Sequence, residues 1–200
     1  MLDWSHKPTL MGERVLLRPF AAGDADAMAQ VLDDPEVLRL TGSVTTSQQA
    51  AQGFTRDAAF DEWYATRHDA PDRLDLAVID RVTGRLVGEV VLNERQLDEK
   101  GALTCNLRIL LGTEGRDRGL GTEAVALLTA YGLDVLALQR ITLEVFAFNP
   151  RARHVYEKLG FVHEATEIDA LIFDGQGIDA HVMAITRSPT GARGPAGGED

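Results

Sequence analysis

Two glycines and two arginines stand together where an apolar run gives way to a helical pattern. Gly119 and Gly121 flank Leu120, and Arg116 and Arg118 come just before them. Glycine permits the backbone conformations and the close approach that a bound ligand can require. The first N–H groups of a helix lack partners within it and carry partial positive charge, so such a turn binds anions. These residue types at this spacing therefore predict a phosphate-binding loop.

The segments on either side of this loop must position it. Residues 107–111 form an apolar run that predicts a buried strand. Apolar residues then recur at helical spacing, which predicts a helix over about 119–136. Residues 140–147 predict a further strand. A strand–helix–strand unit is a right-handed crossover, so its two strands are expected to be a parallel pair.

Two segments together resemble the signatures of the GCN5-related N-acetyltransferases (GNAT superfamily). Residues 116–122, Arg-Asp-Arg-Gly-Leu-Gly-Thr, resemble its Q/R-x-x-G-x-G/A pyrophosphate loop. Residues 149–161 resemble its second signature, an Asn followed by a helix that ends in an aromatic residue and Leu-Gly-Phe. The pair of motifs resembles those of the ribosomal-protein and spermidine acetyltransferase branches. The resemblance implies an α+β GNAT fold, with a mixed, mostly antiparallel sheet of about seven strands, one splayed parallel pair and flanking helices.

The resemblance also implies acetyl-CoA as co-substrate and no metal. A backbone N–H near Ile109 to Leu111 would bond the thioester carbonyl, and such a donor supplies about 2.7–4 kcal/mol to a transition state. For the side chains of Arg116, Arg118, Arg151 and Arg153, a solvated surface charge is the alternative interpretation. The cofactor-binding residues that the resemblance implies are Ile109, Leu110, Leu111, Arg116, Asp117, Arg118, Gly119, Leu120, Gly121, Thr122, Asn149 and Arg153.

Three residues are candidates for proton transfer. By resemblance, Tyr156 is the general acid for the departing thiolate, and its alternative is a core aromatic residue. A phenol can donate this proton at neutral pH. The attacking amine must be neutral, so a carboxylate has to accept a proton. Glu89, inside a predicted strand, is the first candidate base and Glu144 is its rival; both are alternatively exposed carboxylates paired with arginines.

Composition fits one domain. Two hundred residues with 44% hydrophobic content predict a single domain, which the resemblance implies is a GNAT domain over 11–187, with a loosely held arm at 1–10 and a disordered tail at 188–200. The net charge of −11 argues against nucleic-acid binding, which needs a basic face. Cys105 is the only cysteine, which fits a cytoplasmic protein, and no membrane or metal partner is expected.

The rest of the chain predicts alternating helices and strands. A helix from Asp24, as its cap, is expected to stop at Pro35, and a longer one to run over 47–68 with Ser47 as its cap. Gly84 marks a hairpin turn that needs positive φ. The expected strands are 13–19, 75–80, 86–92, 102–111, 140–147 and two within 161–185, and a further helix runs from Pro150 to Gly160.

These observations predict an N-acyltransferase that moves an acetyl or other short acyl group from acetyl-CoA to a primary amine by direct attack in a ternary complex. Residues 20–75 frame the acceptor in the resembled fold, and both a protein N-terminus and a small-molecule amine stay open. A homodimer is also allowed. The alternative is a non-catalytic CoA-binding regulatory module. A dinucleotide fingerprint at 119–124 is rejected because seven residues separate its first glycine from the preceding strand.

Overall fold

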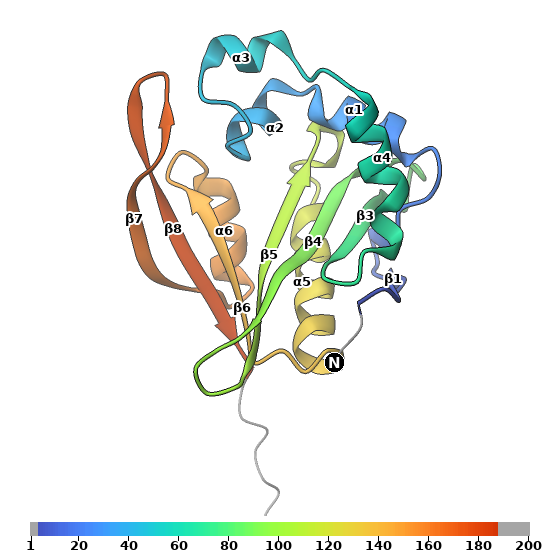
Figure 1. The fold of residues 1–200 in the computed structure, drawn as a ribbon, viewed down its shortest axis with the longest axis vertical. Coiled ribbons are helices and arrows are strands. Elements are labelled where there is room, and N and C mark those ends of the chain that lie inside the picture. The colour runs from blue at the N-terminus through green and yellow to red at the C-terminus, as the bar shows by residue number, and fades with distance from the viewer. Residues whose placement is uncertain (1–3, 188–200) are drawn as a thin grey trace, which may run out of the picture.

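One mixed sheet organises the computed structural model, which describes residues 4–187 (Figure 1). Its strand order is β1-β2-β3-β4-β5-β6-β8-β7. Every neighbouring pair is antiparallel except β5 and β6, which are parallel, so the predicted architecture is confirmed. The strands are β1 (Leu10–Met11), β2 (Val15–Arg18), β3 (Leu74–Asp80), β4 (Leu86–Leu97), β5 (Leu103–Leu111), β6 (Arg140–Phe146), β7 (Val162–Phe173) and β8 (Gln176–Thr186).

Helices cover both faces of the sheet. Helices α5 and α6 pack on one face, and α1 and α4 on the other (Figure 1). The helices are α1 (Asp24–Leu32), α2 (Pro35–Leu40), α3 (Ser47–Gln52), α4 (Ala58–Thr66), α5 (Leu120–Ala130) and α6 (Pro150–Lys158), with short turns η1 (Arg67–Asp69), η2 (Thr113–Gly115) and the π-helical η3 (Tyr131–Val135). The predicted helix over 119–136 is therefore an α-helix that ends in one π turn.

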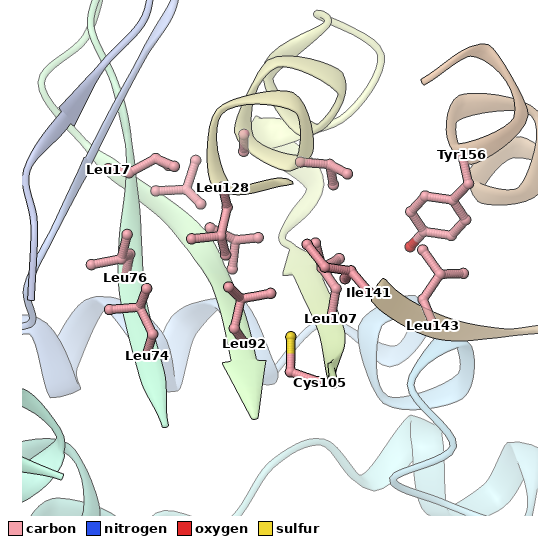
Figure 2. Packing of buried hydrophobic residues seen from close by; sticks show 14 of the residues in the cluster. Leu17, Leu74, Leu76, Leu92, Cys105, Leu107, Leu128, Ile141, Leu143 and Tyr156 are labelled. Carbon is pink, nitrogen blue, oxygen red and sulfur yellow. The ribbon is translucent and has the colours of Figure 1, made fainter. Parts of the chain in front are cut away.

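The core follows the alternation of the strands. Leu74 and Leu76 of β3 face α5, whereas Ala77 faces α1 and α4. Leu128 of α5 and Leu143 of β6 are at most 1% exposed, and Figure 2 shows them within the main apolar cluster. Burying each such side chain contributes about 1.5–3 kcal/mol. This packing fixes α5, and with it the loop at its N-terminus.

The parallel pair splays apart. Strands β5 and β6 pair only at residues 104–106 with 140–142. Beyond that point β5 stays bonded to β4 as far as Leu111, and β6 stays bonded to β8 as far as Phe146. Their ends diverge and leave a gap in the sheet (Figure 1). The splayed pair is therefore as predicted.

The predicted helix over 47–68 is wrong in its continuity, because two helices occupy it. Gly53 ends α3 with φ 77°, a positive φ that glycine tolerates. The Asp57 carboxylate accepts a hydrogen bond from the Phe60 N–H at 2.8 Å and caps α4. Thr46, rather than the predicted Ser47, caps α3 by accepting from the Gln49 N–H at 3.1 Å.

Two other predicted helix boundaries need correction. Pro35 follows the end of α1 but also begins α2, because proline suits a first helical position and Asp34 caps it by accepting from the Glu36 N–H. Asp24 is not the cap of α1, which is Gly23. The Asp24 carboxylate instead accepts hydrogen bonds from Arg18 and from the N–H three residues earlier.

The predicted loose arm is wrong for its described part. Trp4 is 1% exposed within the main apolar cluster, and the Lys7 ammonium donates to the Ala70 carbonyl at 2.7 Å. These contacts fix residues 4–10 on the sheet. The predicted tail at 188–200 lies outside the described residues. Gly84 has φ 70° in the β3–β4 turn, as its hairpin position predicts.

Candidate active site

A cavity, here called the loop cavity, lies beside the glycine loop on the face that carries α5 and α6. It is lined by the end of β5, by residues 115–122, by α2 and by the first turns of α6. The predicted residues that line it are Ile109, Leu110, Leu111, Arg116, Asp117, Gly119, Gly121, Thr122, Asn149 and Tyr156. Arg118, Leu120 and Arg153 do not line it. Arg151, whose side chain the sequence alone leaves as either a phosphate contact or a solvated charge, does line the loop cavity.

The backbone of the loop presents unpaired donors to this cavity. Gly119 is the N-cap of α5 with φ 77°, and no side chain caps the helix. The N–H groups of residues 120–122 therefore lack intrahelical partners, and the helix dipole adds positive charge there. A Cβ on Gly121 would lie 2.9 Å from the Leu111 Cδ1, so glycine keeps the loop close to β5. These unpaired donors lie at the turn where the sequence predicts an anion site.

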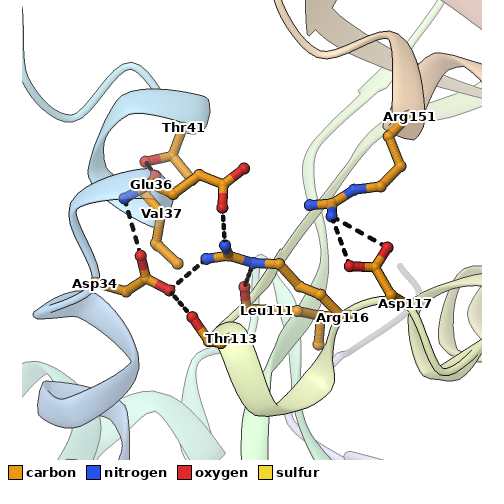
Figure 3. Close-up of polar contacts among 9 residues, drawn as sticks. All are labelled: Asp34, Glu36, Val37, Thr41, Leu111, Thr113, Arg116, Asp117 and Arg151. Carbon is orange, nitrogen blue, oxygen red and sulfur yellow. Dashed lines mark hydrogen bonds and ion pairs between the residues drawn. The ribbon is translucent and has the colours of Figure 1, made fainter.

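The arginine side chains are engaged by carboxylates of the chain itself (Figure 3). Arg116 donates to the Leu111 carbonyl at 3.0 Å and pairs with Asp34 at 2.5 Å and with Glu36, which ties the loop to α2. Burial favours a raised pKa for Asp34, but hydrogen bonds from Thr113 and the backbone and the charge of Arg116 lower it overall. Arg116 therefore holds the loop against α2 and also lines the loop cavity.

The other arginines of the motifs differ in placement. Arg118 pairs with the buried Asp80 at 2.8 Å, which holds its side chain near the β3–β4 turn. Arg153 pairs with Glu157 at 2.9 Å on the surface of α6. Arg151 pairs with Asp117 at 3.2 Å at the rim of the loop cavity (Figure 3). The backbone N–H groups, rather than these side chains, are the donors that lie free at the turn.

The backbone pattern of β5 separates its three candidate amides. The Gly112 N–H donates to the Val87 carbonyl of β4 at 3.0 Å. Successive residues of a strand turn their N–H groups to opposite sides. The Leu110 N–H therefore faces β4, and the N–H groups of Ile109 and Leu111 face the gap beside β6. These two amides are the ones able to bond a thioester carbonyl.

Tyr156 stands between two cavities. Its ring is 7% exposed, lies 6.0 Å from that of Phe161 and extends from α6 towards β6 near Leu143 (Figure 2). Burial raises the pKa of Tyr156 to about 12, so the phenol is protonated at neutral pH. Asn149 lies on both cavities too, and its side-chain oxygen caps α6 by accepting from the Ala152 N–H at 3.1 Å.

The second cavity, here called the sheet cavity, lies on the face that carries α4 and has a volume of about 600 Å³. Both candidate bases line it. Glu89 accepts a hydrogen bond from the Tyr64 hydroxyl at 3.2 Å, and burial raises the pKa of Glu89 against the opposing charge of Arg67. Glu144 lies across the gap on β6, where burial and the charges of Glu167 and Glu94 raise its pKa.

Several lining residues of the sheet cavity were not singled out from the sequence. They are Trp63, Arg67, Arg73, Asn106 and Arg108. Trp63, Arg67 and Arg73 come from the least patterned part of the chain, where no motif marks them. Arg108 interrupts an apolar strand, and a charged residue at such a position is a sequence signal that could have marked it as functional. Within residues 4–187 there is no cluster of His, Cys, Asp or Glu that could hold a metal ion, and no helix long and apolar enough to cross a membrane.

The amino-acid sequence is similar to those of two spermidine acetyltransferases. The spermidine N(1)-acetyltransferase of Escherichia coli K12 is 30% identical over 131 residues, which are 63% of this chain and 70% of that enzyme. The Vibrio cholerae spermidine N(1)-acetyltransferase is 28% identical over 121 residues, 60% of this chain and 67% of that enzyme.

Solved structures establish the fold independently. A GNAT-family acetyltransferase from Bacillus anthracis superposes with a TM-score of 0.72 at 19% identity, covering 90% of this chain and 99% of that one. The Vibrio cholerae spermidine N-acetyltransferase in complex with CoA and spermine superposes with a TM-score of 0.70 at 22% identity, covering 88% and 97%. The sequence model of the acetyltransferase (GNAT) domain matches residues 14–162. The chain therefore belongs to the GNAT acetyltransferase family and is an acetyl-CoA-dependent N-acetyltransferase.

Proposed function

We propose that an amine in the sheet cavity attacks acetyl-CoA held in the loop cavity, in one ternary complex. The observation that carries this proposal is that Ile109, Tyr156 and Asn149 line both cavities. Donor and acceptor thus approach the splayed gap from opposite faces of the sheet. Holding both reactants in attack geometry replaces a bimolecular encounter and removes much of its entropic cost.

Each chemical role falls to a group with suitable geometry. The N–H groups of Ile109 and Leu111 stabilise the negative oxygen that forms on the thioester carbonyl. The unpaired N–H groups of residues 120–122 hold the diphosphate of CoA. The Tyr156 hydroxyl donates a hydrogen bond to the departing sulfur, because a phenol with a raised pKa is protonated at neutral pH when the thiolate develops.

Glu89 is the proposed general base. It pairs in register with Leu110, so its row of the sheet lies between those of Ile109 and Leu111, whose amides are proposed to hold the thioester. Its raised pKa brings its proton affinity closer to neutral pH than that of an ordinary carboxylate, which suits a base. Glu144 is the weaker candidate because it is exposed on β6, beyond the gap.

The proposed acceptor is a small-molecule primary amine. Support comes from the two spermidine acetyltransferases among its relatives and from a cavity of about 600 Å³, which fits a small ligand. A cytoplasmic location is proposed because the single Cys105 leaves no intrachain disulfide. A homodimer is a separate prediction, which light scattering on the purified protein tests.

Release of free CoA thiol from acetyl-CoA in the presence of a panel of primary amines tests the proposed transfer. We expect amine-dependent thiol release and saturation in both substrates, with initial-rate lines that intersect as a ternary complex requires. Parallel lines would contradict direct attack. Acetyl-CoA binding by calorimetry without thiol release from any amine would support the alternative, a non-catalytic CoA-binding module.

A further inference from the structure

We propose that the acceptor is zwitterionic: besides the amine it carries an anionic oxygen group, a carboxylate or phosphate, that binds Arg67, Arg73 and Arg108 in the sheet cavity. This inference rests on the proposed function, because it assumes that the sheet cavity receives the acceptor. It begins with the charges of the lining. Three glutamates are matched there by three arginines, which are Glu89, Glu94, Glu144, Arg67, Arg73 and Arg108.

Two of these arginines share one carboxylate. Asp75 is fully buried and pairs with Arg67 at 2.7 Å and with Arg73 at 2.9 Å. The charge of Glu89 also acts on Arg67, so the positive charge of the two arginines is balanced by carboxylates while not all of their hydrogen-bond donors are used. Both guanidinium groups also lie against the indole of Trp63, at 3.7 Å and 5.0 Å from the ring centroid, which fixes their orientation.

Arg67 has donors without acceptors. Its side chain is 3% exposed, yet its Nε and Nη1 atoms have no hydrogen-bond partner within residues 4–187. Buried polar groups are normally paired, and each unpaired one costs free energy. Because Arg67 lines the sheet cavity, an anionic oxygen placed there would accept the missing hydrogen bonds.

Arg108 extends the same positive region across the sheet. Asp75, Val91 and Arg108 are cross-strand neighbours on β3, β4 and β5 and lie in one row on the face towards α4. Arg108 is exposed and makes no ion pair or side-chain hydrogen bond within the described part of the chain. Its charge acts on Glu144 across the gap, and its guanidinium N–H groups remain available to an anion in the sheet cavity.

The distance between the row of Glu89 and the row of Arg108 predicts the length of the acceptor. Ala77, Glu89 and Leu110 form the row next to the thioester, and the row of Asp75 and Arg108 is two residues away on the same face. Two residues of a strand span about 7 Å. An amine at Glu89 and an anion at the arginines would therefore be separated by about that length. A polyamine, in contrast, would place cations against guanidinium groups.

Three amines that share the same five-carbon chain test this inference: 5-aminopentanoate, 5-aminopentanamide and 1,5-diaminopentane. Their thiol-release rates at saturating acetyl-CoA give kcat/KM for an anionic, a neutral and a cationic end. We expect 5-aminopentanoate to exceed both others by about tenfold or more, the scale of a charge-assisted hydrogen bond. Arg108→Gln should abolish most of that preference by raising KM. Arg85→Gln, an equal charge change on the distant β3–β4 turn, should leave it unchanged.

Equal or better use of the amide or the diamine, or a preference that survives Arg108→Gln, would overturn the inference while leaving acetyl transfer intact. Absence of thiol release with all three amines would contradict the proposed function instead. Calorimetry on the CoA-loaded protein then decides the inference by itself. Tighter binding of 5-aminopentanoate than of its amide, weakened by Arg108→Gln, would sustain the anion site, and equal or undetectable binding of the two would overturn it.

Discussion

Replacing Tyr156 by phenylalanine should slow acetyl transfer without disturbing the fold or the cofactor site. The ring is buried beside Phe161 and Leu143, and phenylalanine keeps that apolar packing. Only the hydroxyl is lost. Melting temperature and acetyl-CoA affinity are therefore expected to match those of the native protein within experimental error.

The size of the effect follows from the raised pKa. Tyr156 has a pKa of about 12, whereas an ordinary thiol has one of about 8.5. Complete proton transfer from the phenol to a free thiolate would be uphill by the difference, about 3.5 units or about 5 kcal/mol. Tyr156 is thus expected to hydrogen-bond the developing thiolate and release its proton late. A hydrogen bond to a charged group contributes about 1.5–3 kcal/mol, which corresponds to a loss of about 10- to 150-fold in kcat.

Steady-state kinetics at several pH values measure this loss. The kcat of the Tyr156→Phe variant should fall by about 100-fold at each pH up to about 9, since the native phenol is protonated throughout that range. Tyr131→Phe, in η3 directly after α5 and packed against the same apolar cluster, is the matched control and should retain full activity. A decrease of less than about threefold would remove Tyr156 from the mechanism.

Three further perturbations address the loop, the base and Arg116. Gly121→Ala places a Cβ 2.9 Å from the Leu111 Cδ1 and would push the loop away from β5, so the KM for acetyl-CoA should rise by about tenfold or more, with a melting temperature near native. An unchanged KM would contradict the loop assignment. Glu89→Gln should remove the acid limb of kcat/KM that rises through the raised pKa of Glu89; retention of that limb would exclude this base. Because that raised pKa makes native stability decrease as pH rises from 4.5 through the folded value, the same variant should be at least as stable as the native protein at pH 7, as denaturant titration would show. Arg116→Gln should weaken acetyl-CoA binding and cost about 1.5–3 kcal/mol of unfolding free energy at pH 7. Because the lowered pKa of Asp34 stabilises the protein only above its unfolded value, the difference from native should shrink as pH falls below about 4, and a constant difference would exclude the ion pair as its cause.

The cofactor loop could be predicted from sequence because its physics is local. The spacing of Gly119 and Gly121 and the helix start after them determine where the unpaired N–H groups lie. The partner of Arg116 could not be predicted in the same way, since Glu36 lies 80 residues earlier and meets it only after α2 has packed. A charged residue in a loop has no sequence signal that separates a free cation from a paired one.

The acceptor side shows the same limit more strongly. Trp63, Arg67 and Arg73 lie in a segment without strong periodicity, and the expected single helix there divides at Gly53. Both arginines pair with Asp75, a charged residue inside a strand. Only the fold shows that Asp75 is buried there with two guanidinium groups as partners. Alternation along β4 also could not assign Glu89 to a face. Its register with Ala77 and Leu110 does so.

The splayed sheet lacks backbone pairing between β5 and β6 at the position where the thioester is proposed to bind. Beyond the Asn106–Thr142 pair, the N–H groups of Ile109 and Leu111 face β6 but have no ladder to join. An unpaired backbone donor costs free energy when it is shielded from water, so an ordinary sheet would close this gap. Closure is prevented because β5 remains bonded to β4 and β6 to β8 on their outer sides, while α5 and α6 pack beneath the divergent ends. The donors are therefore held in position before a thioester arrives, and no reorganisation is required when its oxygen becomes charged.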